Sequence, residues 1–496
     1  MAPPSVTSAI VPPASEMPRP AAMSSRTRTL LQGAIVPTLL GMAWPNILVM
    51  TAQASTGLIE TWFVSRLGRD ALTGMALVFP GFMMMQMISG GAMGGGISSA
   101  IARALGSGRR HDADALVLHA MVINVLLGLF FSALMLAFGR PLYAAMGGRE
   151  GSLDAAMVYS NVVFGGTVLV WAMNALASTI RGTGNMFVPA LAICVGVLVL
   201  VPLSPALIFG FGPIPAMGIA GGAMAVLLTN ALTGALLAWY LLTGHGVVRV
   251  RWVRLRWDML ADILRVGAVG SVSTLQTSLT ILLTTALVGS AAGPDGVAGY
   301  GTGGRLEYLL IPVAFGFGGP MVALVGTNIA AGQPKRALRI ALVGGGMAFL
   351  LTEAIGIAAA IWPYAWLGLF GHDPRMLAIG AAYLRLVGPA YGFFGLGLSL
   401  YFASQGAGRL LWPLLAGLCR MAIAVGGGGL ALYLTGSVAW LFGFLAAALV
   451  VYGAMLAKAV QSGVWFRNPP KMHGVEPASM PAGDAPSIRA GCTAEA

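Results

Sequence analysis

A group of residues that occurs twice within long apolar stretches constrains the fold of this chain more than any other feature. Two glycines and a proline recur at a fixed offset of 224 positions: Gly182, Gly184 and Pro189 return as Gly406, Gly408 and Pro413. The same offset relates Tyr159 to Tyr383. Internal repeats of this length inside apolar segments are typical of membrane transporters that are built from two related bundles. The sequence therefore predicts a duplicated helical bundle in a membrane.

The composition agrees with a chain that is mostly embedded in lipid. Hydrophobic residues make up 57% of the sequence and charged residues 9%, whereas charged residues are about a quarter of a soluble domain. The formal net charge of +12 comes mainly from Lys and Arg between the apolar stretches. Lipid headgroups explain that placement better than nucleic acid does. Three scattered cysteines, Cys194, Cys419 and Cys492, are too few for a disulfide framework or a metal cluster.

Twelve apolar stretches are long enough to cross a bilayer, which takes about 20 residues of helix. They lie near residues 34–64, 71–105, 113–138, 153–179, 187–209, 218–243, 264–290, 297–331, 337–362, 376–404, 411–434 and 437–462. We expect an all-α integral membrane protein with twelve transmembrane helices in two pseudo-symmetric six-helix lobes. The expected parts are a disordered tail over 1–33, an N-terminal lobe over 34–243, a basic linker over 244–263, a C-terminal lobe over 264–462 and a disordered tail over 463–496.

The charges of the loops predict the orientation of the chain. One set of loops carries an excess of Lys and Arg, including four arginines between residues 249 and 256, whereas the opposite set mixes both signs. Loops rich in Lys and Arg stay on the cytoplasmic side. We therefore expect a multi-pass protein of the inner or plasma membrane with both termini in the cytoplasm. The basic linker, in which Arg alternates with Val, Leu and Trp, is expected to lie on the inner leaflet.

Polar residues inside the membrane helices are the candidate functional residues. No spacing of histidines, nucleophiles or metal ligands supports catalysis or a metal centre. Glu60 lies near the outer end of helix 1, and Thr56, Gln53 and Asn46 precede it on the same helical face. Exposing such a polar stripe to lipid costs free energy. The stripe therefore predicts a wet cavity with Glu60 as its ionisable group. The alternative is a carboxylate that is hydrogen-bonded inside the bundle without a role in transport.

Helix 7 carries a matching polar stripe without the charge. Three threonines lie 224 positions after Gln53, Thr56 and Glu60, with a glutamine beside them: Thr277, Thr280, Thr284 and Gln276. We therefore expect one cavity between two lobes, with its ionisable group in the N-terminal lobe alone. Threonines in membrane helices also bond their own backbone, so a purely structural stripe is the alternative.

Further candidates lie on helices 1 and 4. Asn174 and Ser178 share one face of helix 4 and are expected to reach the same cavity. Pro45 predicts a kink in helix 1 that either reshapes the cavity around Glu60 or is static. Four other charged residues remain unassigned: Glu353, Arg420, Arg305 and Glu307. For the last two, a local ion pair or an interfacial position is expected.

Several short motifs occur in a fixed order along the two halves. They are Glu60-Thr61-Trp62-Phe63-Val64-Ser65-Arg66-Leu67-Gly68, Ile180-Arg181-Gly182-Thr183-Gly184, Gly304-Arg305-Leu306-Glu307, Leu-Val-Gly-Thr-Asn-Ile-Ala-Ala-Gly at 324–332 and Ser404-Gln405-Gly406-Ala407-Gly408. With these motifs the chain resembles the multidrug and toxic compound extrusion (MATE) transporters over about residues 35–460. That family belongs to the MOP flippase superfamily, and the chain is similar to its DinF-like branch.

The resemblance implies roles for two residues of helix 1. Glu60 falls on the family's helix 1 aspartate, which is implicated in cation coupling, and Pro45 falls on a proline at which some members bend. Leu200, Ser204 and Pro205 stand where the DinF-like branch often has Asn-x-x-x-Asp-Pro. Where other branches have a helix 7 glutamate, this chain has Gln276 or a neighbouring threonine. Because the ion site is reduced to Glu60, we expect protons rather than Na⁺ as the coupling ion, and no cofactor.

The expected function is secondary active antiport by alternating access. The chain is expected to export amphipathic, cationic organic compounds or drugs in exchange for protons or Na⁺. Its expected partners are small organic substrates and membrane lipids, with no nucleic acid. It is expected to act as a monomer and not as an enzyme. A flippase for a lipid-linked precursor is the alternative, although the basic residues lie in loops rather than in a cavity. A channel or sensor is less expected because no filter or sensory domain is recognisable.

Overall fold

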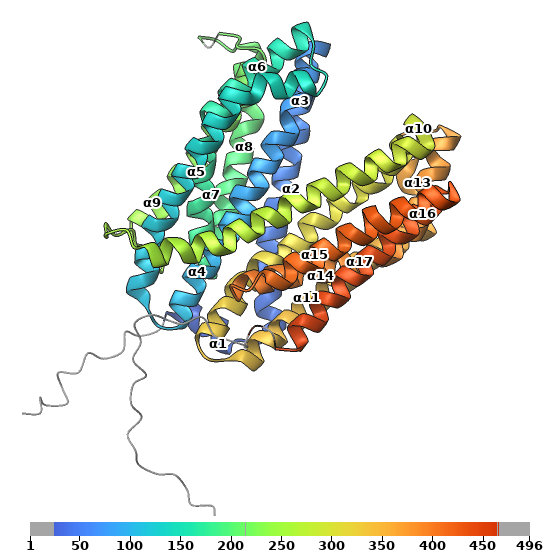
Figure 1. Ribbon diagram of the computed structural model, residues 1–496. Coiled ribbons are helices and arrows are strands. Elements are labelled where there is room, and N and C mark those ends of the chain that lie inside the picture. The colour runs from blue at the N-terminus through green and yellow to red at the C-terminus, as the bar shows by residue number, and fades with distance from the viewer. Residues whose placement is uncertain (1–23, 214, 464, 466–496) are drawn as a thin grey trace, which may run out of the picture.

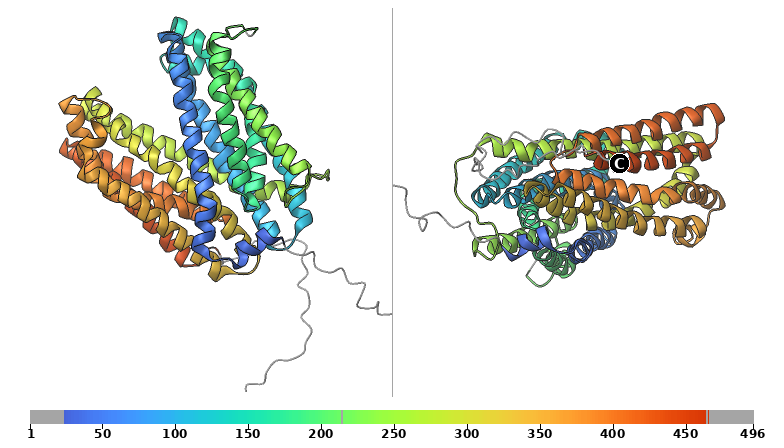
Figure 2. Two further views of the ribbon diagram at one scale, coloured as in Figure 1. Left: turned by 180° about the vertical axis from the view of Figure 1, so that it is seen from behind. Right: turned by 90° about the horizontal axis from the view of Figure 1, so that it is seen from below.

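The described residues form two bundles of helices and no strand. The computed structural model describes residues 24–213, 215–463 and 465. Helices α1 to α9, blue to green, form one bundle, and helices α10 to α17, lime to red, form the other (Figure 1). The bundles converge at the end that carries α1 and splay apart toward the opposite end (Figures 1 and 2).

The N-terminal bundle is built from long apolar helices joined by short turns. Its helices are α1 (Ser25–Gln32), α2 (Ile35–Ser65), α3 (Arg69–Gln86), the π-helix η1 (Met87–Met93), α4 (Gly94–Gly106), α5 (Arg110–Ala145), α6 (Glu150–Gly165), α7 (Thr167–Gly182), α8 (Phe187–Phe209) and α9 (Ile219–Leu242). Helices α3, η1 and α4 follow one another without a break and form one long span. The pair α6 and α7 is bent by 45° and forms another.

The C-terminal bundle follows the same plan with different breaks. Its helices are α10 (Trp257–Ala330), α11 (Pro334–Ile361), α12 (Pro363–Leu367), α13 (Pro374–Val387), the 3₁₀ turn η2 (Gly388–Ala390), α14 (Tyr391–Gly406), α15 (Leu411–Met421), the π-helix η3 (Ala422–Gly427), α16 (Gly428–Thr435) and α17 (Val438–Gln461). Helix α10 has 74 residues, which would extend about 110 Å if it were straight. It instead turns back at Gly293, whose φ of 66° and ψ of −162° are not helical.

The number of membrane crossings follows from these breaks. Ten spans of the described chain are long and apolar enough to cross a membrane, and the bent pair α6 and α7 makes eleven. Because α10 doubles back at Gly293, it accounts for two crossings. The described chain therefore has twelve crossings in two six-helix lobes, as the sequence predicts.

The repeated glycines of the two halves perform the same packing role. A Cβ atom at Gly182 of α7 would lie 2.8 Å from the backbone oxygen of Ser98 in α4. A Cβ atom at Gly406 of α14 would lie 2.6 Å from the backbone oxygen of Val322 in α10. Ser98 and Val322 are themselves 224 positions apart. The repeat therefore preserves a close approach of two helices, which only a residue without a side chain allows.

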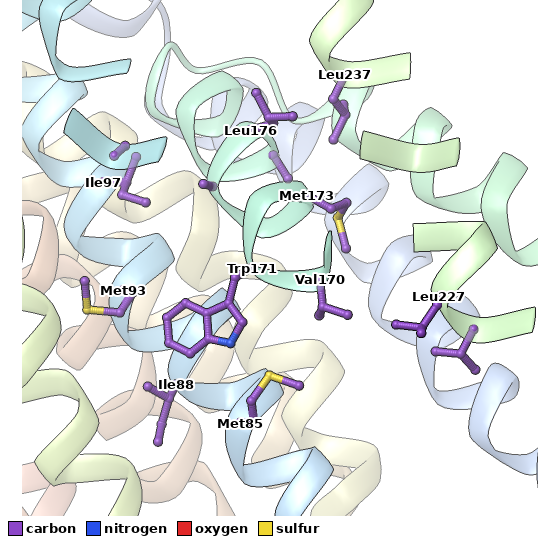
Figure 3. Packing of buried hydrophobic residues seen from close by; sticks show 14 of the residues in the cluster. Met85, Ile88, Met93, Ile97, Val170, Trp171, Met173, Leu176, Leu227 and Leu237 are labelled. Carbon is purple, nitrogen blue, oxygen red and sulfur yellow. The ribbon is translucent and has the colours of Figure 1, made fainter. Parts of the chain in front are cut away.

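The largest apolar core lies in the N-terminal bundle. Trp171 of α7 is fully buried, and it lies among Met85, Ile88 and Met93 of α3 and η1 (Figure 3). Its ring stacks on Phe131 of α5 at a centroid distance of 5.4 Å. Residues of three spans thus meet around one indole ring, which fixes the π-helical segment η1 against the bundle.

Helix α2 packs against both bundles. Leu39 and Ala43, in its first half, belong to an apolar cluster with Phe317 and Met321 of α10. Val64, near its end, belongs to the core of the N-terminal bundle. Seen from behind, α2 (dark blue) accordingly leans toward the yellow and orange helices at the converged end (Figure 2).

The expected boundaries of the two tails are corrected by the structure. Helix α1 occupies part of the segment that was expected to be disordered, because Leu30 is buried and its carbonyl accepts a hydrogen bond from the Asn328 side chain at 3.0 Å. At the other end Trp465 is buried, and its indole donates to Ser404 Oγ at 3.3 Å. The rest of both expected tails lies outside the described residues.

The basic linker is fixed to α5 of the N-terminal bundle. The backbone N–H of Arg249 donates to Oδ1 of the buried Asp114 at 2.8 Å, and Arg251 lies 3.4 Å from the other carboxylate oxygen. The backbone N–H of Arg256 donates to Nε2 of the buried His119 at 2.9 Å. Helix α10 begins directly after this contact, several residues before the expected start of the second lobe. Protein contacts, and not the charge pattern alone, therefore determine the path of the linker.

Candidate functional site

Glu60 is buried inside the N-terminal bundle, where α2 faces α6 and α9. Its side chain is 6% exposed. Tyr159 of α6 donates its hydroxyl to Glu60 Oε1 at 2.8 Å. Gly222 of α9 faces the same oxygen, since a Cβ atom there would lie 3.5 Å from it, at ordinary contact distance. Glu60 is thus a titratable group held by one phenol in an otherwise apolar interior.

The remaining polar residues of α2 do not share this environment. Thr56 donates its hydroxyl to the backbone oxygen of Ala52 at 3.1 Å. The side chain of Asn46 donates to the backbone oxygen of Phe315 in α10 at 2.7 Å, and Gln53 is half-buried between them. The stripe therefore divides along the helix: Glu60 contacts its own bundle, whereas Asn46 bonds to the opposite bundle. Pro45 lies beside Asn46, and α2 remains helical on both sides of it.

The polar residues of α7 are tied to the π-helix η1. The Asn174 amide donates to Gln86 Oε1 at 3.2 Å and to Ser89 Oγ at 3.1 Å. Ser178 Oγ is buried and has no hydrogen-bond partner in the described part of the chain. A Cβ atom at Gly94 would lie 2.5 Å from that oxygen, so α7 and α4 meet closely here. These side chains join α7 to the second span rather than to Glu60.

The polar stripe of α10 lines two adjoining cavities in the C-terminal bundle. Thr277 and Thr280 donate to the backbone oxygens of Ser273 and Gln276 at 3.0 and 2.9 Å. The first cavity is lined by Ser273, Gln276, Thr277, Thr280, Tyr401, Pro413, Gly417, Arg420 and Tyr452. The second is lined by Thr280, Ile281, Thr284, Tyr300, Glu307, Tyr383, Val387, Arg420, Ala424, Leu445, Ala448 and Leu449. Thr277 and Thr280 therefore bond to the backbone of their own helix and also line a cavity.

Within the C-terminal bundle, the second cavity has an ionisable residue that the sequence analysis did not assign to a cavity. Glu307, in the second half of α10, lines the second cavity together with Thr284 and Arg420. Tyr383 of α13 donates its hydroxyl to Glu307 Oε1 at 2.5 Å. A comparison at the Glu60 position of the repeat finds Thr284 and misses this carboxylate, because Glu307 comes from the next span. The repeat of Tyr159 as Tyr383 was the feature of the sequence that could have led to Glu307.

Of the two alternatives expected for Arg305 and Glu307, a local ion pair or an interfacial position, the ion pair is absent from the described chain. The guanidinium of Arg305 lies over the ring of Phe370 at 5.4 Å. Glu307 is instead turned inward to Tyr383. Arg305 and Glu307 are two residues apart on one helix, and side chains at this spacing point in different directions.

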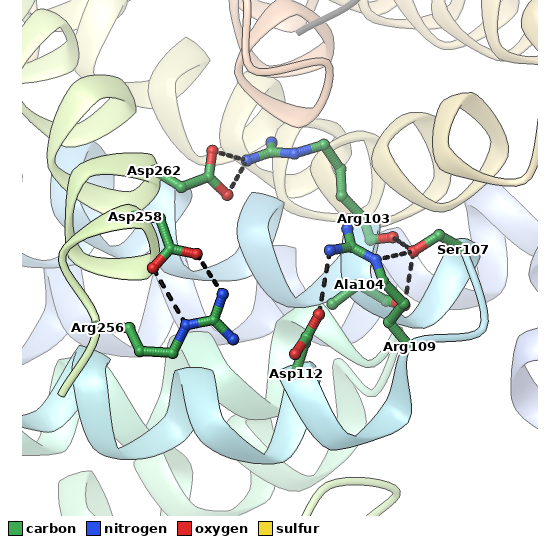
Figure 4. A network of polar contacts seen from close by, with 8 residues as sticks. All are labelled: Arg103, Ala104, Ser107, Arg109, Asp112, Arg256, Asp258 and Asp262. Atoms are coloured by element: carbon green, nitrogen blue, oxygen red, sulfur yellow. Dashed lines mark hydrogen bonds and ion pairs between the residues drawn. The ribbon is translucent and has the colours of Figure 1, made fainter. Parts of the chain in front are cut away.

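Polar contacts join the bundles at the converged end. Nη2 of Arg103 in α4 donates to both carboxylate oxygens of Asp262 in α10, each at 2.8 Å (Figure 4). Ser99 Oγ donates to the backbone oxygen of Gln405 at 2.6 Å, and the Gln405 side chain donates to the Gly91 oxygen at 3.3 Å. Helix α4 is thus bonded to both α10 and α14 at the end where α1 lies.

Comparison with known proteins places this architecture in one family. The MatE family profile matches residues 45–206 and 271–428, one segment in each bundle. Among solved structures, "Crystal structure of MATE in the straight conformation" has a TM-score of 0.81 at 22% identity and covers 89% of this chain and 98% of that chain. An outward-facing multidrug resistance MATE transporter of the MOP superfamily has a TM-score of 0.79 at 23% identity, with the same coverage.

Curated relatives extend over most of the chain. A FAD transporter of Shewanella oneidensis is 27% identical over 79% of this chain and 87% of its own length. The probable multidrug resistance protein NorM of Thermotoga maritima is 24% identical over 76% of this chain and 81% of its own length. Members of this family are transporters and not enzymes. With its profile match, its two bundles and its twelve crossings, this chain belongs to the MatE family of multi-pass membrane transporters.

Proposed function

We propose that this protein exports amphipathic organic compounds, cationic drugs among them, in exchange for protons by alternating access. It would act as a monomer in the inner or plasma membrane, with both termini in the cytoplasm. The observation that carries the proposal is the pair of Glu60 and Tyr159, a buried carboxylate and the hydroxyl that donates to it inside the N-terminal bundle. A buried ionisable residue in a membrane bundle is a functional candidate by default.

The position of Glu60 on α2 supports a coupling role. Uptake of a proton removes the charge of Glu60, adds an O–H donor to its carboxyl group and weakens the group as the acceptor of the Tyr159 hydrogen bond. The same helix is bonded to the other bundle through Asn46 and the Phe315 carbonyl. A change at Glu60 can therefore alter how α2 packs between the two bundles. Such a change shifts an equilibrium between two conformations only if they bind the proton with different affinity.

The arrangement of the bundles supports access from one side at a time. They are bonded together at the end that carries α1 and splay apart at the opposite end. With the termini in the cytoplasm, the bundles would meet on the cytoplasmic side and separate toward the outside. Protons would reach Glu60 from that side, and substrate would leave to that side.

The names of the relatives support two classes of substrate. Several curated relatives carry multidrug resistance names, which favours drugs, including the cationic compounds expected from the sequence. The relative named as a FAD transporter favours a second candidate, a phosphate-bearing flavin. A lipid-linked precursor remains the alternative for a flippase of the same superfamily.

Accumulation of dyes in inside-out vesicles tests the coupling. An acidic interior should drive uptake of a cationic dye by the wild type, whereas a Na⁺ gradient of equal size should not replace it. Glu60→Gln should abolish proton-driven uptake while the protein remains in the membrane. Glu353→Gln is the matched control, because Glu353 accepts from the Gly392 backbone N–H at 2.6 Å, remote from Glu60, and Gln keeps an acceptor oxygen. Proton-driven uptake by Glu60→Gln at the wild-type rate would refute the proposal.

A further inference from the structure

We infer that Arg420 forms a recognition site in the C-terminal bundle for an anionic, oxygen-rich group of the transported compound, a phosphate or a carboxylate. The inference rests on the proposed function in one respect: the compound that binds here is the exported substrate. It concerns a different bundle and a different charge from the coupling pair of Glu60 and Tyr159.

Arg420 lies deep inside a membrane span. It is nine residues after Leu411, the first residue of the span that runs to Thr435. At 1.5 Å per residue it is about 14 Å along a helix that crosses a hydrocarbon core of about 30 Å. An arginine near the middle of the bilayer is costly, and such residues face the interior of a bundle or an aqueous cavity and serve substrate paths.

The guanidinium of Arg420 forms no ion pair with a carboxylate in the part of the chain that the structure describes. No Asp or Glu oxygen of the described residues lies within 4.0 Å of it, and no hydrogen-bond acceptor is recorded for it in that part of the chain. Its contacts are instead with the rings of Tyr452 and Phe394, at 5.6 and 5.8 Å from the centroids. Such cation–π contacts are not hydrogen bonds, so the five N–H donors of the guanidinium remain available to a ligand.

The cavity beside Arg420 offers further donors. Ser273, Thr277 and Thr280 already donate to their own helix. The amide of Gln276 and the hydroxyls of Tyr401 and Tyr452 line the same cavity and have no recorded hydrogen bond in the described chain. One guanidinium, one amide and two phenols favour a ligand with several acceptor oxygens, because bidentate pairing of a guanidinium with phosphate or carboxylate is strong and directional.

Glu307 explains how the charge of Arg420 is tolerated without a ligand. It lines the adjoining cavity together with Arg420, while its Oε1 accepts from Tyr383 at 2.5 Å. The hydroxyl of Thr284 in that cavity is buried and has no partner in the described chain. The carboxylate thus balances the charge at a distance and leaves the guanidinium edge free to bind an anion.

The local helix geometry also favours a site at this position. The π-helix η3 begins at Ala422, two residues after Arg420. π-helical turns are rare in proteins and are frequent at functional sites. A Cβ atom at Gly417, one turn before Arg420, would lie 2.7 Å from Gln276 Oε1, so the absence of a side chain there leaves space for the Gln276 amide.

Equilibrium binding to the full-length protein in nanodiscs, without any ion gradient, tests this inference. Two ligand pairs separate the two sources of the anion: FMN against riboflavin for phosphate, and rhodamine B against its ethyl ester for carboxylate. The wild type should prefer the anionic member of at least one pair. Arg420→Gln should weaken binding of that member by about tenfold to a hundredfold, since a hydrogen bond to a charged group is worth about 1.5–3 kcal/mol. Binding of its uncharged or esterified partner should stay unchanged.

The matched control is Arg385→Gln. Arg385 also lies on a membrane span and over a tyrosine ring, that of Tyr364 at 5.6 Å, but it lines neither cavity. Arg420→Lys should keep part of the preference for the anionic ligand, because lysine retains the positive charge but lacks the planar set of N–H donors of a guanidinium. Gln276→Leu should reduce the preference as well, which keeps the test decisive if Arg420→Gln does not fold.

The inference would be overturned if Arg420→Gln kept the wild-type preference for the anionic ligand, or if both Arg420→Lys and Gln276→Leu kept it. It would also be overturned if the wild type bound both members of each ligand pair equally. Because no gradient is present, these outcomes do not depend on proton coupling. Failure of the proposed function would appear elsewhere, as proton-driven uptake that survives Glu60→Gln.

Discussion

Tyr159 and Tyr383 lie 224 positions apart in the two halves of the chain, and each donates its hydroxyl to a carboxylate inside its own bundle. The two carboxylates are not equivalent in the repeat. Glu60 comes from the first span of its half, whereas Glu307 comes from the second span of the other. The duplication has kept the tyrosine and changed the span that supplies its partner, so each lobe has an acid bonded to its copy of the tyrosine.

We predict that the two carboxylates differ in function. Glu60→Gln should abolish proton-driven uptake, because it removes the titratable group of the N-terminal bundle. Glu307→Gln should keep proton-driven uptake and change substrate selectivity, because Glu307 shares a cavity with Arg420. Uptake of cationic and anionic dyes by both variants, at matched expression, measures the difference. Equal loss of coupling in both variants would contradict a coupling role confined to Glu60.

The contact of Arg103 with Asp262 should favour the conformation in which the converged end is closed. The Arg103 side chain is 15% exposed and the Asp262 side chain 48% exposed, so the pair should contribute about 1 kcal/mol after screening by solvent. Asp262→Asn should therefore raise the population of the other conformation about fivefold. Distances between spin labels on the two bundles check this. Asp112→Asn, which alters the pair with Arg109 within one bundle, is the control.

Both repeated glycines should be intolerant of a methyl group. Gly182→Ala and Gly406→Ala each place a Cβ atom within 3 Å of a backbone oxygen of the neighbouring helix, and such overpacking costs about 1–3 kcal/mol. Thermal unfolding in detergent should show a lower midpoint for both variants. Gly346→Ala in α11, where a Cβ atom meets nothing within 4 Å, should leave the midpoint unchanged. A neutral effect at either repeated position would show that the helices can move apart at little cost.

The linker should detach from α5 when Asp114 is replaced. Asp114→Ala removes the acceptor for the Arg249 backbone and the partner of Arg251, and loss of a buried acceptor costs about 1–3 kcal/mol. Trypsin should then cleave the arginines of the linker faster than in the wild type. Asp154→Ala, which removes an acidic residue of α6 away from the linker, serves as the control. Equal cleavage rates in both variants would indicate that the lipid surface, and not Asp114, protects the linker.

Most of the fold could be predicted from the sequence, since long apolar segments in water-free surroundings must be helical and must cross the bilayer. The repeat of Gly182 as Gly406 also indicated two related lobes. The breaks within the spans were not predictable in the same way. The turn of α10 at Gly293 depends on one backbone conformation, and the bend between α6 and α7 depends on how both pack.

The candidate site was only partly predictable. Glu60 was identified because a carboxylate in an apolar helix is costly wherever the helix lies. Its partner Tyr159, and the division of the α2 stripe at Asn46, depend on which helices surround each turn.

The sequence by itself determined that this protein is a duplicated bundle of membrane helices with few charges inside, because apolar length and internal repetition are properties of the chain alone. Only the tertiary structure decided which charges meet. Glu307 and Arg420 are far apart in sequence and line one cavity, and their positions follow from the packing of helices that no local pattern encodes. Electrostatic effects depend on distance and burial in space, so the second lobe's acid and its neighbouring arginine could be recognised only after the helices were placed.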